Sequence, residues 1–252
     1  MSSSSDDVHH LMDESSVRFY PKRGRSRGLS QPERRIKAKR LQYSGIHPSP
    51  SDEIDLFFIE VFDENGEFVL RFGEHGREPG QLARPIDVAE TINGNYLISD
   101  FDSHCVNVFT PVGRYISRFG QRYLGGPKGL TVDSRGRILV VDAKTCMLCI
   151  FKPTGKFINR FGARGVADSQ FGIPMYVAVN SQDEILVSDF QNHSIKRFDC
   201  NGIFLAKIGV NGMQPGCFHS PTGLAIDSND NIFVCDWGNC RLQVGKCKSF
   251  YI

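Results

Sequence analysis

Three side chains of catalytic type, Ser188, Asp189 and His193, lie within the stretch SDFQNHSIKRFD at 188–199. In a nucleophilic triad the histidine takes the serine proton and the carboxylate orients the ring. A nucleophilic serine also needs a strained turn and an oxyanion hole, and no motif for either surrounds Ser188. The stretch is therefore a catalytic cluster, a ligand-binding strip or one unit of a repeating frame, and the rest of the chain decides which.

Cysteine and histidine offer a second kind of chemistry, zinc binding. The chain's CxxC motif is CMLC at 146–149, and it falls in a strand-like run, where positions i and i+3 point to opposite faces. A column of residues at the same place in successive units reads His104, Cys146, His193 and Cys240. Equivalent positions in different units are expected about 10 Å apart, beyond one zinc shell. We expect no metal, no cofactor and no small-molecule substrate.

One sequence unit is written four times, and the opening stretch belongs to it. Prolines fall at 85, 127, 174 and 221, at intervals of 42, 47 and 47, and aspartates at 100, 142, 189 and 236 keep the same intervals. The four passages are RPIDVAETINGNYLISDFDSHCVNVF, GPKGLTVDSRGRILVVDAKTCMLCIF, IPMYVAVNSQDEILVSDFQNHSIKRF and SPTGLAIDSNDNIFVCDWGNCRLQV. The stretch 188–199 is thus the end of a second strand, a loop and a third strand.

The alternation of short apolar runs and turn-forming residues in these units predicts an all-β fold. Short β-branched runs such as RILVVD and EILVSD are bounded by turn formers, and no helical stripe persists. Self-similarity at this period in a strand-rich chain predicts the four-stranded antiparallel blades of a β-propeller. A carboxylate at a strand end accepts backbone N–H bonds, so we expect a structural role for Asp100, Asp142, Asp189 and Asp236.

The chain divides into three regions by composition. Residues 1–52 are poor in large apolar groups, and from Arg18 to Arg40 ten Lys/Arg stand against one acid, Glu33, so we expect a disordered tail. Its basic part, 22–40, is a solvated linker, a nuclear import signal or a contact for RNA or acidic lipid. The propeller is expected at 53–246, with repeats at about 69–110, 116–152, 158–200 and 205–246, and 247–252 as a short irregular C-terminus.

Composition also limits the cellular compartments in which the protein is expected. The formal charge is +2 and the eight cysteines are scattered, mostly inside strand-like runs, which favours reduced thiols over a disulfide framework. No apolar run is long enough for a membrane span, and the N-terminus lacks a secretory signal pattern. We expect a cytoplasmic protein, with the nucleus as the alternative that the basic segment offers.

The order of proline, apolar core, hhVxD, xNH, VF and G-x-F-h-x-x-F-G resembles the NHL repeat. The units resemble most the C-terminal NHL propeller of tripartite-motif (TRIM) proteins, particularly the neuronal group. That resemblance implies a six-bladed propeller that recognises substrate proteins for a RING ubiquitin ligase or binds RNA. This chain departs from it, with four repeats plus the tail of an earlier one, FFIEVFDENGEFVLRFG, and GKCKSFYI after RLQV. We expect a fragment, a truncated gene model or a divergent splice form, with open sheet edges and marginal stability in isolation.

Residues after the recurring aspartates and prolines are expected to cluster at one rim and bind a partner. Aromatic and polar side chains there suit peptide hot spots or base stacking, although the rings also suit packing between blades. The set comprises Phe101, His104, Lys128, Lys144, Tyr176, Phe190, His193, Trp237 and Asn239.

The sequence favours a protein-recognition module without catalytic activity of its own. An RNA-binding regulator is the alternative, through the basic tail or the propeller face, but 61–244 holds 18 Lys/Arg and 19 Asp/Glu, a weak electrostatic footprint for RNA. An enzyme is a third hypothesis, because some distantly similar propellers are lyases or esterases with a central metal.

Overall fold

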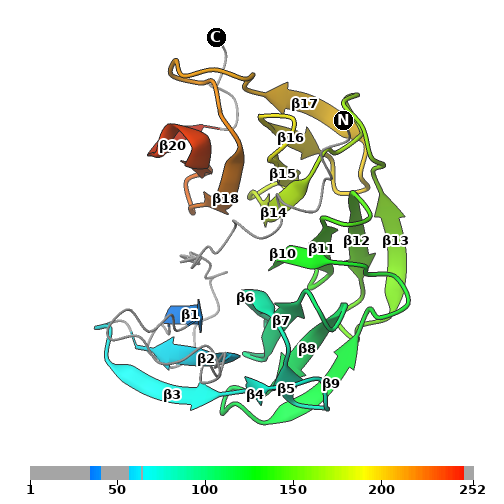
Figure 1. Cartoon of the computed structure of the whole chain (residues 1–252), viewed down its shortest axis with the longest axis vertical. Coiled ribbons are helices and arrows are strands. Elements are labelled where there is room, and N and C mark those ends of the chain that lie inside the picture. The colour runs from blue at the N-terminus through cyan, green and yellow to red at the C-terminus, as the bar shows by residue number, and fades with distance from the viewer. Residues whose placement is uncertain (1–34, 41–56, 64, 247–252) are drawn as a thin grey trace, which may run out of the picture.

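The computed structural model describes residues 35–40, 57–63 and 65–246. Their strands form five antiparallel sheets that stand side by side along an open arc (Figure 1), and β4 (Glu74–His75) and β5 (Gln81–Leu82) form a sixth, two-stranded parallel sheet. The predicted all-β propeller architecture is confirmed. Within the described residues no helix is long and apolar enough to cross a membrane.

The second, third and fourth sheets are four-stranded meanders, each running from the middle of the arc outward. The second sheet contains β6 (Pro85–Glu90), β7 (Tyr96–Asp100), β8 (Cys105–Phe109) and β9 (Tyr115–Phe119). The third contains β10 (Pro127–Val132), β11 (Ile138–Asp142), β12 (Met147–Phe151) and β13 (Phe157–Phe161). The fourth contains β14 (Pro174–Val179), β15 (Ile185–Asp189), β16 (Ser194–Phe198) and β17 (Phe204–Ile208).

Tight turns set the register of these meanders. In the turn between β10 and β11, Asp133 Oδ1 accepts hydrogen bonds from the amides of Arg135 and Arg137 at 3.0 and 2.8 Å. Gly136 takes a φ of +76° in the same turn, a conformation that costs glycine little. Asp199 closes the turn between β16 and β17 in the same way, through the amides of Asn201 and Ile203.

Apolar side chains pack between neighbouring sheets rather than within one sheet. Leu139 and Val141 of β11 pack with Val177 and Val187 of the next sheet, while Val140 on the other face of β11 packs with Leu97 of the preceding one. All five residues of β11 are buried, as are those of β7 and β15. Burial of both faces explains why these strands read as apolar runs instead of alternating patterns.

The first sheet includes a strand from the predicted tail. It contains β1 (Arg35–Arg40), β2 (Phe57–Phe62) and β3 (Phe68–Phe72), and all six residues of β1 pair with β2. Residues 35–40 of the predicted tail thus pair as a strand, while the rest of 1–52 lies outside the described residues and its disorder stays a prediction. β1 contacts β6 as β7 contacts β10, so β1 occupies the second-strand position of its sheet.

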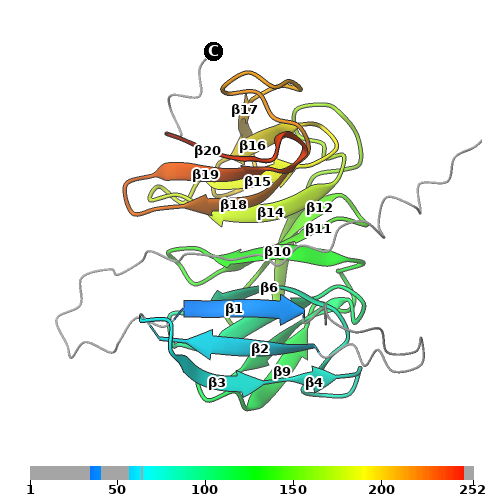
Figure 2. The same ribbon diagram turned by 60° about the vertical axis from the view of Figure 1, so that its left-hand side comes forward.

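The fifth sheet has three strands, β18 (Pro221–Ile226), β19 (Asn231–Asp236) and β20 (Arg241–Lys246), with the 3₁₀ helix η2 (Trp237–Asn239) between the last two (Figure 2). In the part of the chain that the structure describes, no strand follows β20 at its outer edge. The predicted C-terminal segment 247–252 lies outside that part.

Candidate partner-binding face

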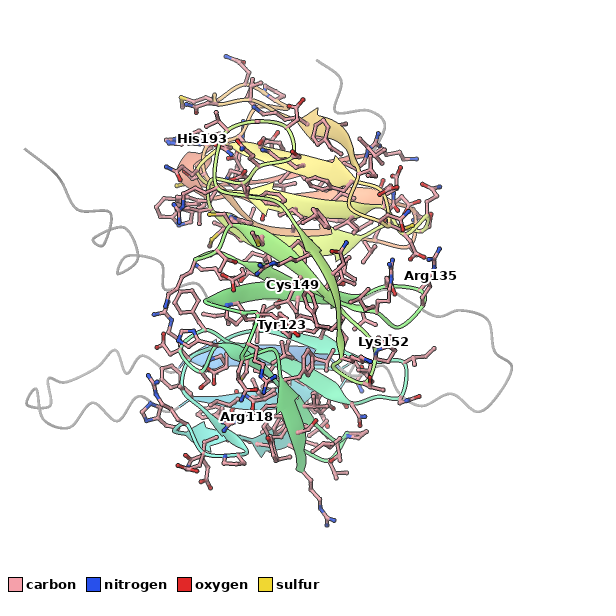
Figure 3. All side chains as sticks on the ribbon, turned by 90° about the vertical axis from the view of Figure 1, so that its right-hand side faces the viewer. Arg118, Tyr123, Arg135, Cys149, Lys152 and His193 are labelled. Atoms are coloured by element: carbon pink, nitrogen blue, oxygen red, sulfur yellow. The ribbon has the colours of Figure 1, made fainter. Side chains whose placement is uncertain are left out.

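The sheets expose two different faces. We call loop face the side formed by the connections from second to third strands and from each sheet to the next, and turn face the side formed by the tight hairpin turns. Figure 3 shows His193 at one edge of the sheets and Arg135 and Lys152, both in hairpin turns, at the opposite edge. The nine residues predicted to bind a partner lie in loops of the loop face or at strand positions beside it.

The four recurring aspartates hold the loop face to the strands. All four are fully buried. Asp100 accepts hydrogen bonds from the amides of Ala83 and Arg84 at 2.7 and 2.9 Å, and Asp189 accepts them from Gly172 and Ile173 at 3.1 Å. In each case the carboxylate at the end of a second strand fastens the loop that precedes the innermost strand of its own sheet.

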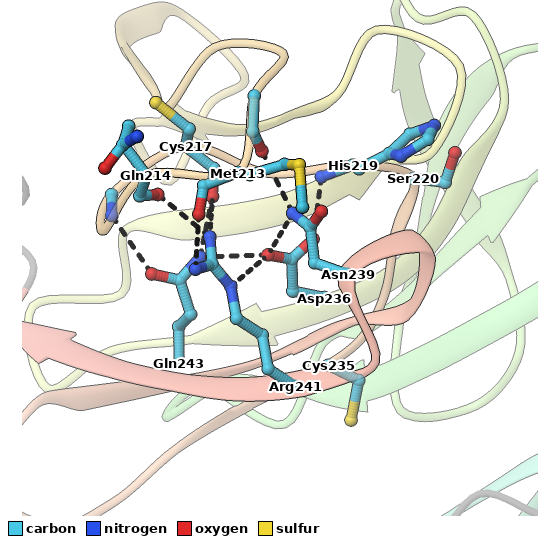
Figure 4. Close-up of polar contacts among 12 residues, drawn as sticks. Met213, Gln214, Cys217, His219, Ser220, Cys235, Asp236, Asn239, Arg241 and Gln243 are labelled. Carbon is cyan, nitrogen blue, oxygen red and sulfur yellow. Dashed lines mark hydrogen bonds and ion pairs between the residues drawn. The ribbon is translucent and has the colours of Figure 1, made fainter.

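In the fifth sheet this arrangement extends into a network around Asp236 (Figure 4). Asp236 accepts from the His219 amide at 2.7 Å and from Arg241 Nε at 2.8 Å. Arg241 also donates to the backbone carbonyls of Met213, Gln214 and Cys217. Burial alone would raise the pKa of Asp236, but the hydrogen bonds that it accepts outweigh burial and lower that pKa.

In the fourth sheet a buried lysine, Lys196, holds the corresponding loop. The Lys196 side chain has no solvent exposure, and its Nζ lies 3.7 Å from Asp189 Oδ2. It donates to the carbonyls of Ala167 (2.8 Å) and Gln170, so it fixes the loop 162–173 from beneath. Burial lowers the pKa of Lys196 despite the opposing carboxylate.

The column of histidines and cysteines shares a backbone conformation. His104, Cys146, His193 and Cys240 all have φ between +50° and +55°. The chain takes this left-handed turn at the end of each loop between second and third strands, a conformation uncommon for non-glycine residues. Among the residues that the structure describes, no group of His, Cys, Asp or Glu is arranged to hold a metal ion.

The hydrogen bonds of Ser188 and His193 do not match those of a catalytic triad. Ser188 Oγ donates to the Thr222 carbonyl at 2.6 Å and accepts from the Tyr176 amide at 3.0 Å, which ties the fourth sheet to the fifth. His193 Nδ1 instead accepts from the Ser220 amide at 3.0 Å. The serine and the histidine therefore serve two separate contacts between sheets and do not act on each other.

The predicted partner-binding residues divide by exposure. Phe101, Tyr176 and Phe190 are buried, whereas the Trp237 side chain packs on Phe190 with 5.9 Å between ring centroids and remains 49% exposed. The Asn239 side-chain amide is engaged inside the protein, on the carbonyl of Gly212 and on Asp236. Lys128 is buried, Lys144 is exposed, and His104 and His193 are half-buried.

Two further exposed apolar residues lie in loops of the same face and were not among the residues predicted from the sequence. Val166 in the loop 162–173 is 83% exposed and Met213 in the loop 209–220 is 77% exposed. Both loops are held close to the second-to-third-strand loops, since Asn192 donates to the carbonyl of Gly165 as Asn239 does to Gly212. The sequence signal that could have identified them is an apolar residue within an otherwise polar, glycine-containing loop.

His193 and His219 form a pair on the same face. Their ring centroids lie 5.3 Å apart, and His219 is exposed. Burial, followed by the nearby His219, lowers the pKa of His193. The neutral form also suits the hydrogen bond from Ser220, because a neutral ring nitrogen can accept and a protonated one cannot.

Comparison with known proteins supports the repeat. The family model described as NHL repeat matches residues 218–244, from the loop before β18 to β20. The Protein brain tumor of Drosophila melanogaster is 35% identical over 82 residues, which cover 32% of this chain and 8% of that protein. The chain thus matches less than a tenth of this curated relative's length. The predicted resemblance to the NHL repeat is confirmed.

Solved structures resemble this chain over most of its length. They include a Bacteroides thetaiotaomicron protein of unknown function (TM-score 0.64, 13% identity, 84% of this chain and 56% of that one). A catalytically inactive virginiamycin B lyase from Staphylococcus aureus with quinupristin has a TM-score of 0.58 (13% identity, 86% and 75%). The WD40 β-propeller domain of Doa1 also has 0.58 (15% identity, 77% and 59%). At these identities the likeness shows the propeller fold alone.

Proposed function

We propose that this chain is a protein-recognition module that binds its partner on the loop face of the fourth and fifth sheets. The observation that carries the proposal is that three loops of this face each expose an apolar residue, Val166, Met213 or Trp237, and that these loops are fixed by Lys196, Arg241 and the recurring aspartates. Rigid loops with exposed tryptophan and methionine suit a protein hot spot, because little conformational entropy is lost on binding.

Within this proposal, the partner is a substrate protein of a TRIM-type ubiquitin ligase, as the NHL match and the similarity to Protein brain tumor suggest. The contribution of the described residues is binding and not catalysis. Ubiquitin transfer would then come from a RING domain elsewhere, and the complex would assemble in the cytoplasm.

Site-directed photo-crosslinking in cells tests the proposal. A photoreactive amino acid replaces Trp237 in one version of the chain and Val112 in the other. Val112 is 65% exposed and belongs to a hairpin turn of the turn face. We expect a discrete set of protein adducts from position 237 that position 112 does not give. Identical adducts at both positions, or none at 237, would overturn the assignment of this face.

RNA binding is the second candidate, because the family that the repeats resemble includes RNA-binding members. Gel shifts against a random RNA pool at near-physiological salt separate the two functions. Tight, sequence-selective binding that is lost on changing Lys128 or Tyr176 would favour RNA over protein recognition. The near-neutral propeller and the burial of Tyr176 favour protein.

A further inference from the structure

Three cations surround one buried aromatic ring at the junction of the second and third sheets. Arg84 Cζ lies 4.2 Å from the centroid of the Phe101 ring, Lys144 Nζ 4.7 Å and Lys128 Nζ 6.0 Å. Phe101 itself is 4% exposed. The negative face of an aromatic ring attracts cations, so the ring gathers them at one spot. We call Arg84, Lys128 and Lys144 the cation cluster.

The cluster is not part of the repeating frame. Arg84 precedes β6, Lys128 lies on β10 and Lys144 follows β11, so three separate elements contribute. At the corresponding positions of the junction between the third and fourth sheets stand the uncharged residues Gly126, Met175 and Gln191. A structural requirement of the fold would recur in each sheet, and this group of charges does not recur.

A short loop leaves the cluster close to solvent. The connection between β9 and β10 is 120–126, whereas the later connections between sheets are 162–173 and 209–220. A Cβ added to Gly126 would lie 2.8 Å from Lys144 Cγ and 2.9 Å from Phe101 Cε2, so the loop passes directly against the ring and the lysine stem. Lys144 remains exposed beside it.

The acids Asp102, Asp100 and Asp142 leave room for an anion at Arg84 and Lys144. Asp102 reaches Arg84 at 3.9 Å only, with 36% of the Arg84 side chain and 37% of the Asp102 side chain exposed. Asp100 and Asp142 are buried and accept backbone amide hydrogen bonds from 83–84 and from Gly126 and Thr145. Arginine forms bidentate hydrogen bonds with a carboxylate, and adjacent lysines strengthen the attraction.

We propose that the cation cluster binds carboxylates of an acidic segment in a protein partner. This inference rests on the proposed function, since it extends the partner-binding surface along the loop face from the fourth and fifth sheets to the second and third. Arg84 receives the carboxylate and Lys144 contacts it from solvent. A protein is favoured over RNA because Phe101 is buried and cannot stack on a base, and because the propeller carries no net positive charge.

Fluorescence anisotropy with the full chain tests the inference. The probes are a short labelled peptide that alternates glutamate and glycine, its glutamine counterpart, and a labelled single-stranded RNA of equal charge. Lys144→Glu is compared with Lys152→Glu, the same charge change at an exposed lysine of the turn face (Figure 3). We expect the glutamate peptide to bind, the glutamine peptide not to bind, and K144E to weaken binding at least about tenfold while K152E leaves it unchanged.

Equal affinities for K144E and K152E would overturn the inference, as would glutamine-peptide binding as tight as that of the glutamate peptide. RNA binding that K144E abolishes, without peptide binding, would also overturn it and assign the cluster to nucleic acid. If the glutamate peptide fails to bind while position 237 still gives its discrete adducts, the acidic segment is wrong and the recognition face stands.

Discussion

The fourth and fifth sheets share one sequence frame but differ in burial. Ile195 is 1% exposed and its counterpart Leu242 is 59% exposed; Ser188 is buried and its counterpart Cys235 is exposed. The fourth sheet has a neighbour on this side, and the described part of the chain ends with the fifth. The repeat thus determines where each strand runs. The neighbouring sheet determines how much the side chains of that strand contribute to the free energy of unfolding. Stability in a repeat array belongs largely to the interfaces between units.

Loss of the buried lysine should show the largest difference between the two sheets. Lys196→Met leaves Asp189 buried without its cation, so we expect the free energy of unfolding to fall by about 3–5 kcal/mol. Gln243, the half-buried counterpart in the fifth sheet, donates to Asp236 and the Cys217 carbonyl, and Gln243→Met should cost about 1 kcal/mol. Urea unfolding followed by circular dichroism measures both.

Lys196→Gln is the matched control, because it introduces the side chain that the fifth sheet uses. It should recover part of the stability that Lys196→Met loses. If Lys196→Met lowers the free energy of unfolding no more than Gln243→Met does, the predicted difference between the two sheets is wrong.

Truncation of the matched apolar residues comes next. Ile195→Ala should cost about 2–5 kcal/mol, since it opens a cavity between the fourth and fifth sheets. Leu242→Ala should change stability by less than about 0.5 kcal/mol, because that side chain is already in water. Equal losses in urea unfolding would mean that the outer face of the fifth sheet is covered as well.

The hydroxyl that joins the two sheets should have a smaller effect. Ser188→Ala removes the partner of the Tyr176 amide and the Thr222 carbonyl and should cost about 1–2 kcal/mol. Cys235→Ala at the equivalent exposed position should leave the unfolding midpoint almost unchanged. A midpoint shift for Cys235→Ala as large as that for Ser188→Ala would contradict the account.

His193 should make the smallest contribution, visible as a pH dependence. Its pKa is lowered in the folded protein, so the unfolded chain binds more protons as the pH falls below about 6.5. Stability is therefore fully present above that pH and declines as the solution becomes more acidic. His193→Gln, whose side-chain carbonyl can still accept from Ser220, should flatten the decline between about pH 7 and pH 5 in thermal unfolding. An unchanged slope would show that His193 does not titrate against folding.

The recurring features of the fold were predictable from the sequence. The intervals between prolines 85, 127, 174 and 221 predicted the sheets, because a motif that recurs at this spacing must occupy equivalent places. The predicted units begin one strand early: the repeat at 69–110 joins β3 of the first sheet to β6, β7 and β8 of the second. Sequence similarity shows the period of a repeat and not where each sheet closes.

Contacts that occur at one place in the chain and do not recur in the other units were not predictable from the sequence. The strand β1 at 35–40 has a charged, basic sequence that indicates no strand on its own, and it pairs along β2. Lys128 and Lys144 entered the predicted site as separate residues, whereas their gathering with Arg84 on Phe101 depends on the three-dimensional junction of two sheets. Long-range pairing of this kind leaves no local pattern in the chain.

Native-state alkylation of cysteines tests the exposure of the outer face of the fifth sheet most directly. Iodoacetamide treatment of the folded chain, read residue by residue in a mass spectrometer, should modify Cys235 rapidly. Cys105 and Cys149 should stay protected, because they are fully buried and burial raises the pKa of each thiol to about 12. Protection of Cys235 equal to that of Cys149 would contradict the account, since it would mean that the outer face of the fifth sheet is covered.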